Sequence, residues 1–484
     1  MAGSTGEIET GTVAPYADLR EFIEIVDALG ELRRADGVDL RYEIGALCTI
    51  SREAPMCPTT LCDKFEGVEP GFRVLLNPTR SLNRMALCYG LPVGLSQAEY
   101  NRIGPERAAT VTPIPPRVVQ DGPILENVME GDKIDLTKLP RPWWHEGDGG
   151  AYLGTGDAII TRDPDSDWVN IGTYRVMYQD PTHVSVYINP DNHGLLHRER
   201  WFAKGKPCPV AISLGHDPLL FLVGATSQPA GQCEYDYMGA IKGAPVDVII
   251  EPHTGIPIPA RSEIIIAGEF MPEDIRDEGP FGETFGYYAS GVQQLPTVTV
   301  KAVYYRNNPI IIGNPPSRPP HERNATSIRF SRGESPLERV QRLVPGVRDV
   351  YSGYPSGGGH LAVISIQQEY PGHAMQAGLA LINGMGHRPR YVIVVDEDVD
   401  IHNSVELLWA VTTRTDPVKD FHVIERTTSS PVEPAIPPWE NNLMSRAILD
   451  ATRPFEWIDK FPATVDVAPE LRERTIEKWR SILQ

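Results

Sequence analysis

The chain has 484 residues, 41% of them hydrophobic, and 64 acidic against 45 basic side chains give it a formal net charge of −19. This length predicts two or three domains, at roughly 100–200 residues each. Such acidity without a basic run argues against nucleic acid or an anionic membrane as a partner. No stretch approaches the roughly 20 unbroken apolar residues of a membrane span, and the polar start does not resemble a signal peptide. We therefore expect a cytoplasmic protein.

The six cysteines do not form a metal or disulfide pattern. Cys57 and Cys62 in CPTTLC are the only close pair, and no second pair or nearby histidine completes a zinc site. Reduced, buried thiols are the simplest interpretation.

The first segment has the pattern of a small α/β domain. ADLREFIEIVDALGELRRA predicts a helix that Asp18 caps and Gly30 ends. Helical and strand-like stretches alternate to about residue 105, and the proline-rich 112–123 follows. We place the N-terminal α/β domain at 1–120.

The pattern changes in the next two segments. Short β-branched and aromatic runs, such as AIITR, WVNIGTYRVMY and TVTVKAVYYR, predict an antiparallel sheet closed into a barrel over 121–325, with HGLLHRERWFAKG as a helix. After this, HLAVISI and RYVIVVDEDVDI read as buried strands between helices, which predicts a C-terminal α/β domain over 326–484. The tail helix places Leu471, Ile476, Trp479 and Leu483 on one face that should dock on something.

Two carboxylates flank the turn EGPFGE. Glu278 and Glu283 would not meet on a regular strand or helix, but two glycines and Pro280 permit an irregular turn that brings them together. In a dry pocket, repulsion and burial would raise one pKa toward neutrality and create a proton donor. The alternative is a pair of solvated turn residues.

An arginine lies inside an apolar run. Arg175 in WVNIGTYRVMY needs a counter-charge if buried, and it could neutralise Glu278 or Glu283 or anchor an anionic substrate. Asn170 and Thr173 add polar groups on the same segment. An edge-strand arginine that reaches solvent is the alternative.

Other polar residues suit a hard divalent ion. His193, Glu234 and an Asn amide oxygen fit Mn²⁺ or Mg²⁺ better than a thiolate-binding metal, although His193 alone could be a helix-cap residue. Asp396, Asp398 and Asp400 end a predicted strand and could bind metal, but capping of the next helix is favoured. Common dinucleotide, nucleotide and catalytic-triad motifs are absent from the sequence.

Together these motifs resemble the UbiD family of reversible decarboxylases, which use prenylated FMN. The family hallmark, an arginine with two glutamates in E-G-P-F-G-E, corresponds to Arg175, Glu278 and Glu283. NIGTYR, DNH and EYDYMGA match the positions of the family's metal ligands, here Asn170, His193 and Glu234. Further signatures, including IIGNPPSRPPHE and SRAILDATRPFEW, follow in the expected order, so the resemblance spans nearly the whole chain.

The resemblance implies that the central domain is a split β-barrel that binds prenylated FMN, with Mn²⁺ (or Mg²⁺) bridging to its phosphate and K⁺ (or Na⁺) nearby. It implies dimerisation through the C-terminal domain, with possible higher assembly, and a UbiX-type flavin prenyltransferase as cofactor supplier. The implied cofactor-binding residues are Asn170, Thr173, Tyr174, Arg175, Asn192, His193, Ala225, Thr226, Ser227 and Glu234.

The implied reaction is reversible, non-oxidative decarboxylation of an α,β-unsaturated or (hetero)aromatic acid through a covalent adduct with the cofactor. Glu283 would protonate the carbon, while Glu278 and Arg175 form the orienting ion pair. The substrate pocket would include Asn192, Thr284, His321 and Trp439. The alternatives are an ordinary FMN-dependent oxidoreductase on a split barrel and a non-catalytic subunit of a larger carboxylase.

Overall fold

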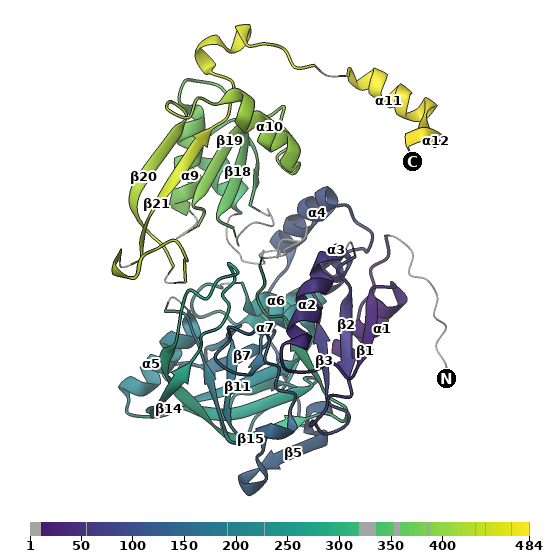
Figure 1. Ribbon diagram of the computed structural model, residues 1–484, viewed down its shortest axis with the longest axis vertical. Coiled ribbons are helices and arrows are strands. Elements are labelled where there is room, and N and C mark those ends of the chain that lie inside the picture. Colours follow the sequence, from purple (N-terminus) through teal and green to yellow (C-terminus); the bar gives the residue numbers. More distant parts are fainter. Residues whose placement is uncertain are drawn as a thin grey trace.

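The computed structural model confirms the mixed α/β class. It describes residues 11–54, 56–190, 192–226, 228–318, 335–352, 359–384, 388–430, 432–440, 442–465 and 467–483. Three sheets from the first two thirds of the chain lie together, and a fourth sheet from the C-terminal third stands apart from them (Figure 1).

The first sheet has the order β1-β2-β3-β16, with β1 and β2 parallel, β2 and β3 antiparallel, and β3 and β16 parallel. Asp18 caps the first helix as predicted, because its carboxylate accepts from the amides of Arg20 and Glu21. β16 lies within 121–325, which we expected to belong entirely to the central domain, yet it pairs with β3 of the first sheet. The domain boundaries at residues 120 and 325 therefore stay a prediction. The elements are β1 (Leu32–Asp36), β2 (Thr59–Asp63), β3 (Arg73–Leu76), β16 (Ile310–Gly313), α1 (Leu19–Ala28), α2 (Glu43–Glu53), α3 (Leu82–Cys88) and α4 (Gln97–Thr110).

The central sheet is antiparallel and curled, in the order β6-β9-β10-β15-β14-β11-β7-β8, with β5 paired to β15. Within the described residues the end strands β6 and β8 do not pair, so the sheet forms a half-barrel. Its strands are β5 (Asn127–Glu130), β6 (Tyr152–Gly154), β7 (Ala158–Arg162), β8 (Val169–Gly172), β9 (Val176–Asp180), β10 (His183–Val186), β11 (Cys208–Gly215), β14 (Ile264–Glu278) and β15 (Gln293–Tyr305).

Side-chain alternation buries both faces of this sheet. Along β14, Ile264 and Ile266 join one buried cluster while Ile265 and Ala267 join another. The adjoining helices are α5 (His193–Ala203), α6 (Pro218–Gly224) and α7 (Glu234–Lys242). A small sheet combines β4 (Arg117–Val118), β12 (Asp247–Ile250) and β13 (Pro257–Pro259), and 3₁₀ turns occupy Pro123–Glu126, Gly131–Lys133 and Leu136–Lys138.

The C-terminal sheet has the order β17-β18-β19-β21-β20, with a parallel centre and antiparallel edges. Helices α8 and α9 cover one face, and α10 covers the other. The elements are β17 (Val347–Tyr351), β18 (Leu361–Ile366), β19 (Tyr391–Asp396), β20 (Phe421–Thr428), β21 (Leu443–Asp450), α8 (Pro336–Leu343), α9 (His373–Gly384), α10 (Ser404–Arg414) and the 3₁₀ turns Pro438–Glu440 and Phe455–Lys460.

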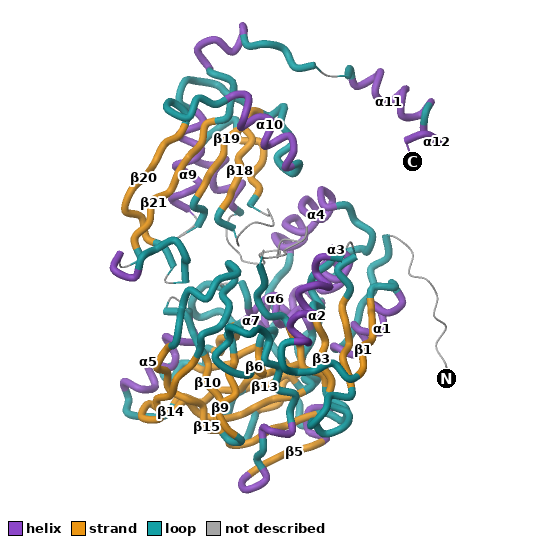
Figure 2. The backbone as a smooth tube through the Cα atoms, in the orientation of Figure 1, coloured by secondary structure: helices purple, strands orange, loops and turns teal. Residues whose placement is uncertain are grey.

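The chain ends in α11 (Pro469–Lys478) and α12 (Arg480–Leu483), which extend away from the C-terminal sheet (Figure 2). Leu471, Ile476 and Trp479 stay exposed, so no described part of the chain covers their shared face, and the side chain of Leu483 is outside the described part. Within the described residues, every helix is too short or too polar to cross a membrane.

Candidate active site

Arg175 lies at a break between two strands. β8 ends at Gly172 and β9 begins at Val176, because β8 pairs with β7 whereas β9 pairs with β10 and β6. We expected Arg175 inside one continuous β-run, and the change of strand partner explains why the run is interrupted. Its side chain is buried, with the whole residue 8% exposed, so the solvent-reaching alternative is wrong.

One guanidinium holds both carboxylates. Arg175 donates through Nε and Nη2 to the two oxygens of Glu278, at 2.8 and 2.7 Å, and through Nη1 to Glu283 Oε1 at 2.5 Å. Glu278, the last residue of β14, is 0% exposed, and Glu283 in the following loop is 9% exposed. The interpretation as solvated turn residues is therefore wrong. The expected repulsion between the carboxylates is offset by the cation that lies between them.

Three further side chains surround the guanidinium. Tyr152 donates its hydroxyl to Glu278 Oε1 at 2.9 Å, Ser290 Oγ accepts from Arg175 at 3.1 Å, and the Tyr187 ring lies 4.2 Å from the guanidinium carbon. Burial alone would lower the pKa of Arg175, but the hydrogen bond and charge of Glu278 and the charge of Glu283 raise it. Arg175 therefore stays protonated. None of these three neighbours was predicted from the sequence, because each lies on a different segment and nothing local marks it.

The loop after β14 is shaped to return Glu283 toward Arg175. Gly279 has φ +89°, and a Cβ there would lie 2.5 Å from the carbonyl oxygen of Gly291, so this position requires glycine. The amide of Glu283 donates to Tyr287 O at 2.8 Å, and that of Gly286 donates to Glu283 O at 2.8 Å. These bonds close a tight turn around the second carboxylate. We call residues 279–292 the acid loop.

The predicted metal ligands gather at the other end of β8. Glu234, the first residue of α7, is buried and accepts at 2.8 Å from the amide of Ile171, next to Asn170. Burial raises the pKa of Glu234 to about 8. Asn170 Nδ2 is buried without a hydrogen-bond partner among the described residues. His193 opens α5, and its ring lies 4.9 Å from that of Trp168, just before β8.

These groups suit a cation that oxygen and imidazole ligands can hold. In the described part of the chain, no three His, Cys, Asp or Glu side chains cluster closely enough for a metal. The predicted set contains only two such residues beside Asn170, so its assignment as a metal site stays a prediction.

The loop after α6 approaches the same strand. A Cβ on Gly224 would lie 3.5 Å from Thr173 Cγ2, Ala225 caps α6, and Thr226 donates to Leu222 O at 3.0 Å. Ser227 lies outside the described residues. Gln228 is 4% exposed, and neither of its buried amide atoms has a partner among the described residues. The sequence analysis did not single out Gln228, although an unpaired buried amide favours a polar ligand at this loop.

Tyr174 lies close to two glycines. A Cβ on Gly172 would come within 2.3 Å of the Tyr174 ring, and one on Gly194, beside His193, within 3.0 Å. Glycine at these two positions therefore lets the ring lie between β8 and the start of α5.

Three of the four predicted substrate residues lie in the described part of the chain. Asn192 precedes α5 and is half-buried, and Thr284 is exposed in the acid loop beside Glu283. Trp439 is 78% exposed in the C-terminal part, so it does not pack against the acid loop. His321 lies outside the described residues. The composition of the pocket stays a prediction.

The aspartates after β19 do not cap the next helix. Asn403 caps α10, since its side chain accepts from the amide of Val405. Asp396 and Asp398 instead accept from Arg414, at 2.9 and 3.0 Å. The capping interpretation is wrong, because a buried arginine far along the chain binds these carboxylates.

Arg175→Met is expected to lower the free energy of unfolding by about 3–5 kcal/mol, because it leaves Glu278 buried without its cation. Urea denaturation of the cofactor-free protein measures this. The double variant Arg175→Met with Glu278→Gln should recover a substantial part of the loss. An Arg175→Met protein as stable as the native one would contradict the claim that Arg175 stabilises the buried carboxylate of Glu278.

Two family models match the chain. The UbiD model, described as 3-octaprenyl-4-hydroxybenzoate carboxy-lyase Rift-related domain, matches residues 117–319, and the corresponding C-terminal domain model matches 332–451. A phenolic acid decarboxylase from Streptomyces sp. (strain D7) is 31% identical over 456 residues, which cover 91% of this chain and 92% of the relative.

Solved structures agree with this match. Vanillic acid decarboxylase from Sedimentibacter hydroxybenzoicus in its closed form has a TM-score of 0.82 at 29% identity, over 97% of this chain and 100% of that one. The UbiD-class enzyme HmfF from Pelotomaculum thermopropionicum in complex with FMN has a TM-score of 0.82 at 26% identity, over 96% and 100%. An evolved dimeric form of HmfF with prFMN gives 0.78 at 26% identity, over 96% and 99%. The chain therefore belongs to the UbiD family of carboxy-lyases.

Proposed function

We propose that this enzyme catalyses the reversible, non-oxidative decarboxylation of an α,β-unsaturated or (hetero)aromatic carboxylic acid, with prenylated FMN as cofactor. The observation that carries the proposal is the buried guanidinium of Arg175 with Glu278 and Glu283 on it. The relatives named for phenolic and vanillic acids favour an aromatic acid as the substrate.

The two glutamates differ in a way that suits separate roles. Glu278 has no exposed surface, receives two bonds from Arg175 and a third from Tyr152, and is therefore fixed. Glu283 receives one bond from Arg175 and keeps some exposure on the loop. We assign proton transfer to Glu283 and orientation to Glu278. With both carboxylates ionised the three groups carry one net negative charge, so the cluster can take up one proton and become neutral.

The permanent charge of Arg175 serves a second purpose. The guanidinium offsets the charge of Glu278, so a substrate carboxylate that enters beside protonated Glu283 meets a cluster with no net charge. Burial strengthens this compensation, since little water screens the guanidinium.

Prenylated FMN would supply an electron sink for the carbon that loses CO₂. HmfF has been solved with FMN and with prFMN, which supports a flavin here. The unpaired amide of Gln228 and the buried side chains of Asn170 and Glu234 fit a polar, charged group beside β8. We propose contacts to the cofactor from Asn170, Thr173, Tyr174, Arg175, Asn192, His193, Ala225, Thr226, Ser227 and Glu234. A UbiX-type flavin prenyltransferase would supply it.

We further propose that Asn170, His193 and Glu234 hold Mn²⁺ (or Mg²⁺), with K⁺ (or Na⁺) near the loop at 224–229. Glu234 forms no ion pair with another described residue, and burial raises its pKa to about 8. A bound divalent cation would supply the positive charge that this buried carboxylate lacks.

The C-terminal part carries apolar surface suited to a homodimer. Val405, Leu408 and Trp409 lie on one side of α10 and are all exposed. The tail adds exposed Leu471, Ile476 and Trp479. HmfF has an evolved dimeric form, and we propose that this chain also pairs, with higher assembly possible.

Expression with a flavin prenyltransferase should yield protein that retains prFMN by mass spectrometry and releases CO₂ from at least one acid of an aromatic and acrylic panel. Expression without it should yield inactive protein. Hydride transfer needs no arginine-bound acid pair, so we expect no oxidoreductase turnover with unmodified FMN. Absence of CO₂ release and of isotope exchange in every preparation would exclude the proposed reaction.

Glu283→Gln should lower kcat by about 10²–10⁴-fold while prFMN stays bound, because the amide cannot donate the proton. Glu273→Gln, on an exposed position of β14, is the control and should leave turnover unchanged. Near-normal kcat in Glu283→Gln would show that another group is the acid.

His193→Ala and Glu234→Gln should each lose tightly bound Mn²⁺, measured by inductively coupled plasma mass spectrometry, together with most of the flavin absorbance. Each variant removes one of three ligands. His253→Ala, in a partly exposed turn, is the matched control. Native metal content in both site variants would contradict the ligand assignment.

A further inference from the structure

Phe285 points from the acid loop toward the C-terminal part of the chain. It lies two residues after Glu283 and is only 6% exposed. Its ring centre lies 4.5 Å from that of His360 at an interplanar angle of 44°, and the guanidinium carbon of Arg388 lies 5.6 Å away. These contacts link the loop that carries the proposed acid to a sheet that is otherwise set apart in Figure 1.

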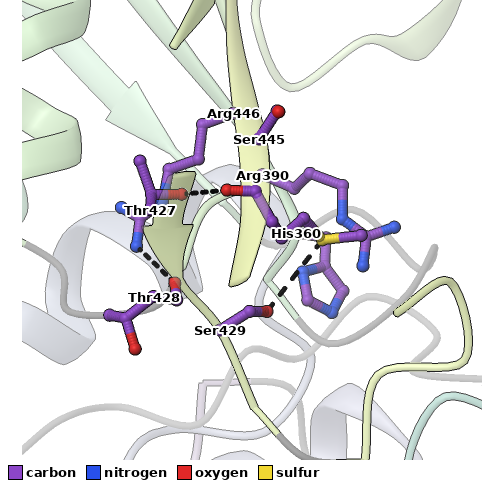
Figure 3. A pocket seen from close by; sticks show the side chains of 8 residues that line it. His360, Arg390, Thr427, Thr428, Ser429, Ser445 and Arg446 are labelled. Atoms are coloured by element: carbon purple, nitrogen blue, oxygen red, sulfur yellow. Dashed lines mark hydrogen bonds between the residues drawn. The ribbon is translucent and has the colours of Figure 1, made fainter. Parts of the chain in front are cut away.

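His360 is firmly held at the start of β18. Its carbonyl oxygen accepts from the amides of both Arg390 and Tyr391, at 2.8 Å each, which ties the amino ends of β18 and β19 together. Its Nε2 lies 2.8 Å from Glu433 Oε1, and Arg390 pairs with the other oxygen of Glu433. Figure 3 shows His360 and Arg390 lining a pocket at this end of the sheet, together with Thr427 and Arg446.

Glu433 anchors this cluster as a buried carboxylate. Burial alone would raise the pKa of Glu433, but the nearby His360 side chain and the charges of Arg390 and Arg388 lower it. A buried carboxylate that keeps its charge holds its cationic partners in fixed positions. The surface that Phe285 meets is therefore rigid.

The opposite side of the acid loop is also supported. A Cβ on Gly286 would lie 3.0 Å from the carbonyl oxygen of Ser317, so the loop runs directly against that segment. The hydroxyl of Ser317 accepts at 2.8 Å from Arg52, which is buried on α2. The turn Glu283–Tyr287 thus lies between a segment fixed by α2 and the aromatic contact with His360.

We propose that Phe285 is a positioning residue, through which His360, Arg388 and Glu433 of the C-terminal part hold Glu283 against Arg175. The structural role of Phe285 is independent of the proposed function, and only the expected effect on the reaction rate rests on that function. Without the contact the turn retains one supported side, and the carboxylate loses its fixed position relative to the guanidinium. A displacement near 1 Å can cost about 10²-fold in rate.

The kinetic test is a double-variant cycle of Phe285→Leu and His360→Gln in the prFMN-loaded enzyme. Each single variant should lower kcat by about 10-fold, which is ~1.4 kcal/mol, with KM changed by less than about 2-fold. The double variant should be no slower than the worse single one, because both remove the same contact. Phe72→Leu, a buried phenylalanine whose ring meets Tyr305 at 5.7 Å, is the matched control and should keep native kcat. Multiplicative losses in the double variant would overturn the proposal.

A second readout needs no cofactor and no activity. Hydrogen–deuterium exchange in the apo protein should be about 10-fold faster at the amides of Glu283 and Gly286 in both variants, while β14 amides at 264–270 keep native protection. His360→Gln lies outside the acid loop, so it tests the contact even if Phe285→Leu fails to fold. Native protection of the turn in His360→Gln would overturn the proposal. If the native enzyme decarboxylates no acid, the proposed function is wrong. The exchange experiment still tests whether the Phe285–His360 contact holds the turn in place.

Discussion

The structure depends on one buried guanidinium that holds two carboxylates. Removing these charges from water costs several kcal/mol per ion, so the cluster is tolerable only when Arg175, Glu278 and Glu283 are buried together. Tyr152 and Ser290 complete the hydrogen bonds of the cluster. Because these five residues come from three separate stretches of the sequence, at 152, at 175 and at 278–290, the complete cluster exists only in the folded chain.

Two irregular features of the half-barrel create this arrangement. The break between β8 and β9 lets the chain move between strand partners and leaves Arg175 at the junction. The acid loop between β14 and β15 then returns Glu283 to the same guanidinium. β8 also carries Asn170, and the amide of the next residue, Ile171, donates to Glu234. We propose that this short strand thereby brings the proton donor and the flavin site close together.

Local sequence patterns predicted the features that are formed by residues close together in the sequence. The helical spacing of apolar residues and the capping residue predicted α1, with Asp18 at its start. The cost of a buried cation left a pair with the EGPFGE glutamates as one possibility for Arg175, and the family resemblance implied that pair. Contacts formed only by packing could not be predicted. Among these are Tyr152 on Glu278, the Phe285–His360 pair and β16 in the first sheet. The capping assignment of Asp396 failed for the same reason, because its partner Arg414 comes later in the chain.

The central claim is that Glu283 moves the proton at the carbon that exchanges CO₂. The most direct measurement is deuterium incorporation from D₂O into the decarboxylated product by prFMN-loaded enzyme, followed by NMR, since this exchange needs the cofactor and the proton transfer but no uptake or release of CO₂. The account predicts exchange at that one carbon with the native enzyme and with Glu273→Gln, and loss of exchange in cofactor-loaded Glu283→Gln. Exchange at the native rate in Glu283→Gln would contradict it.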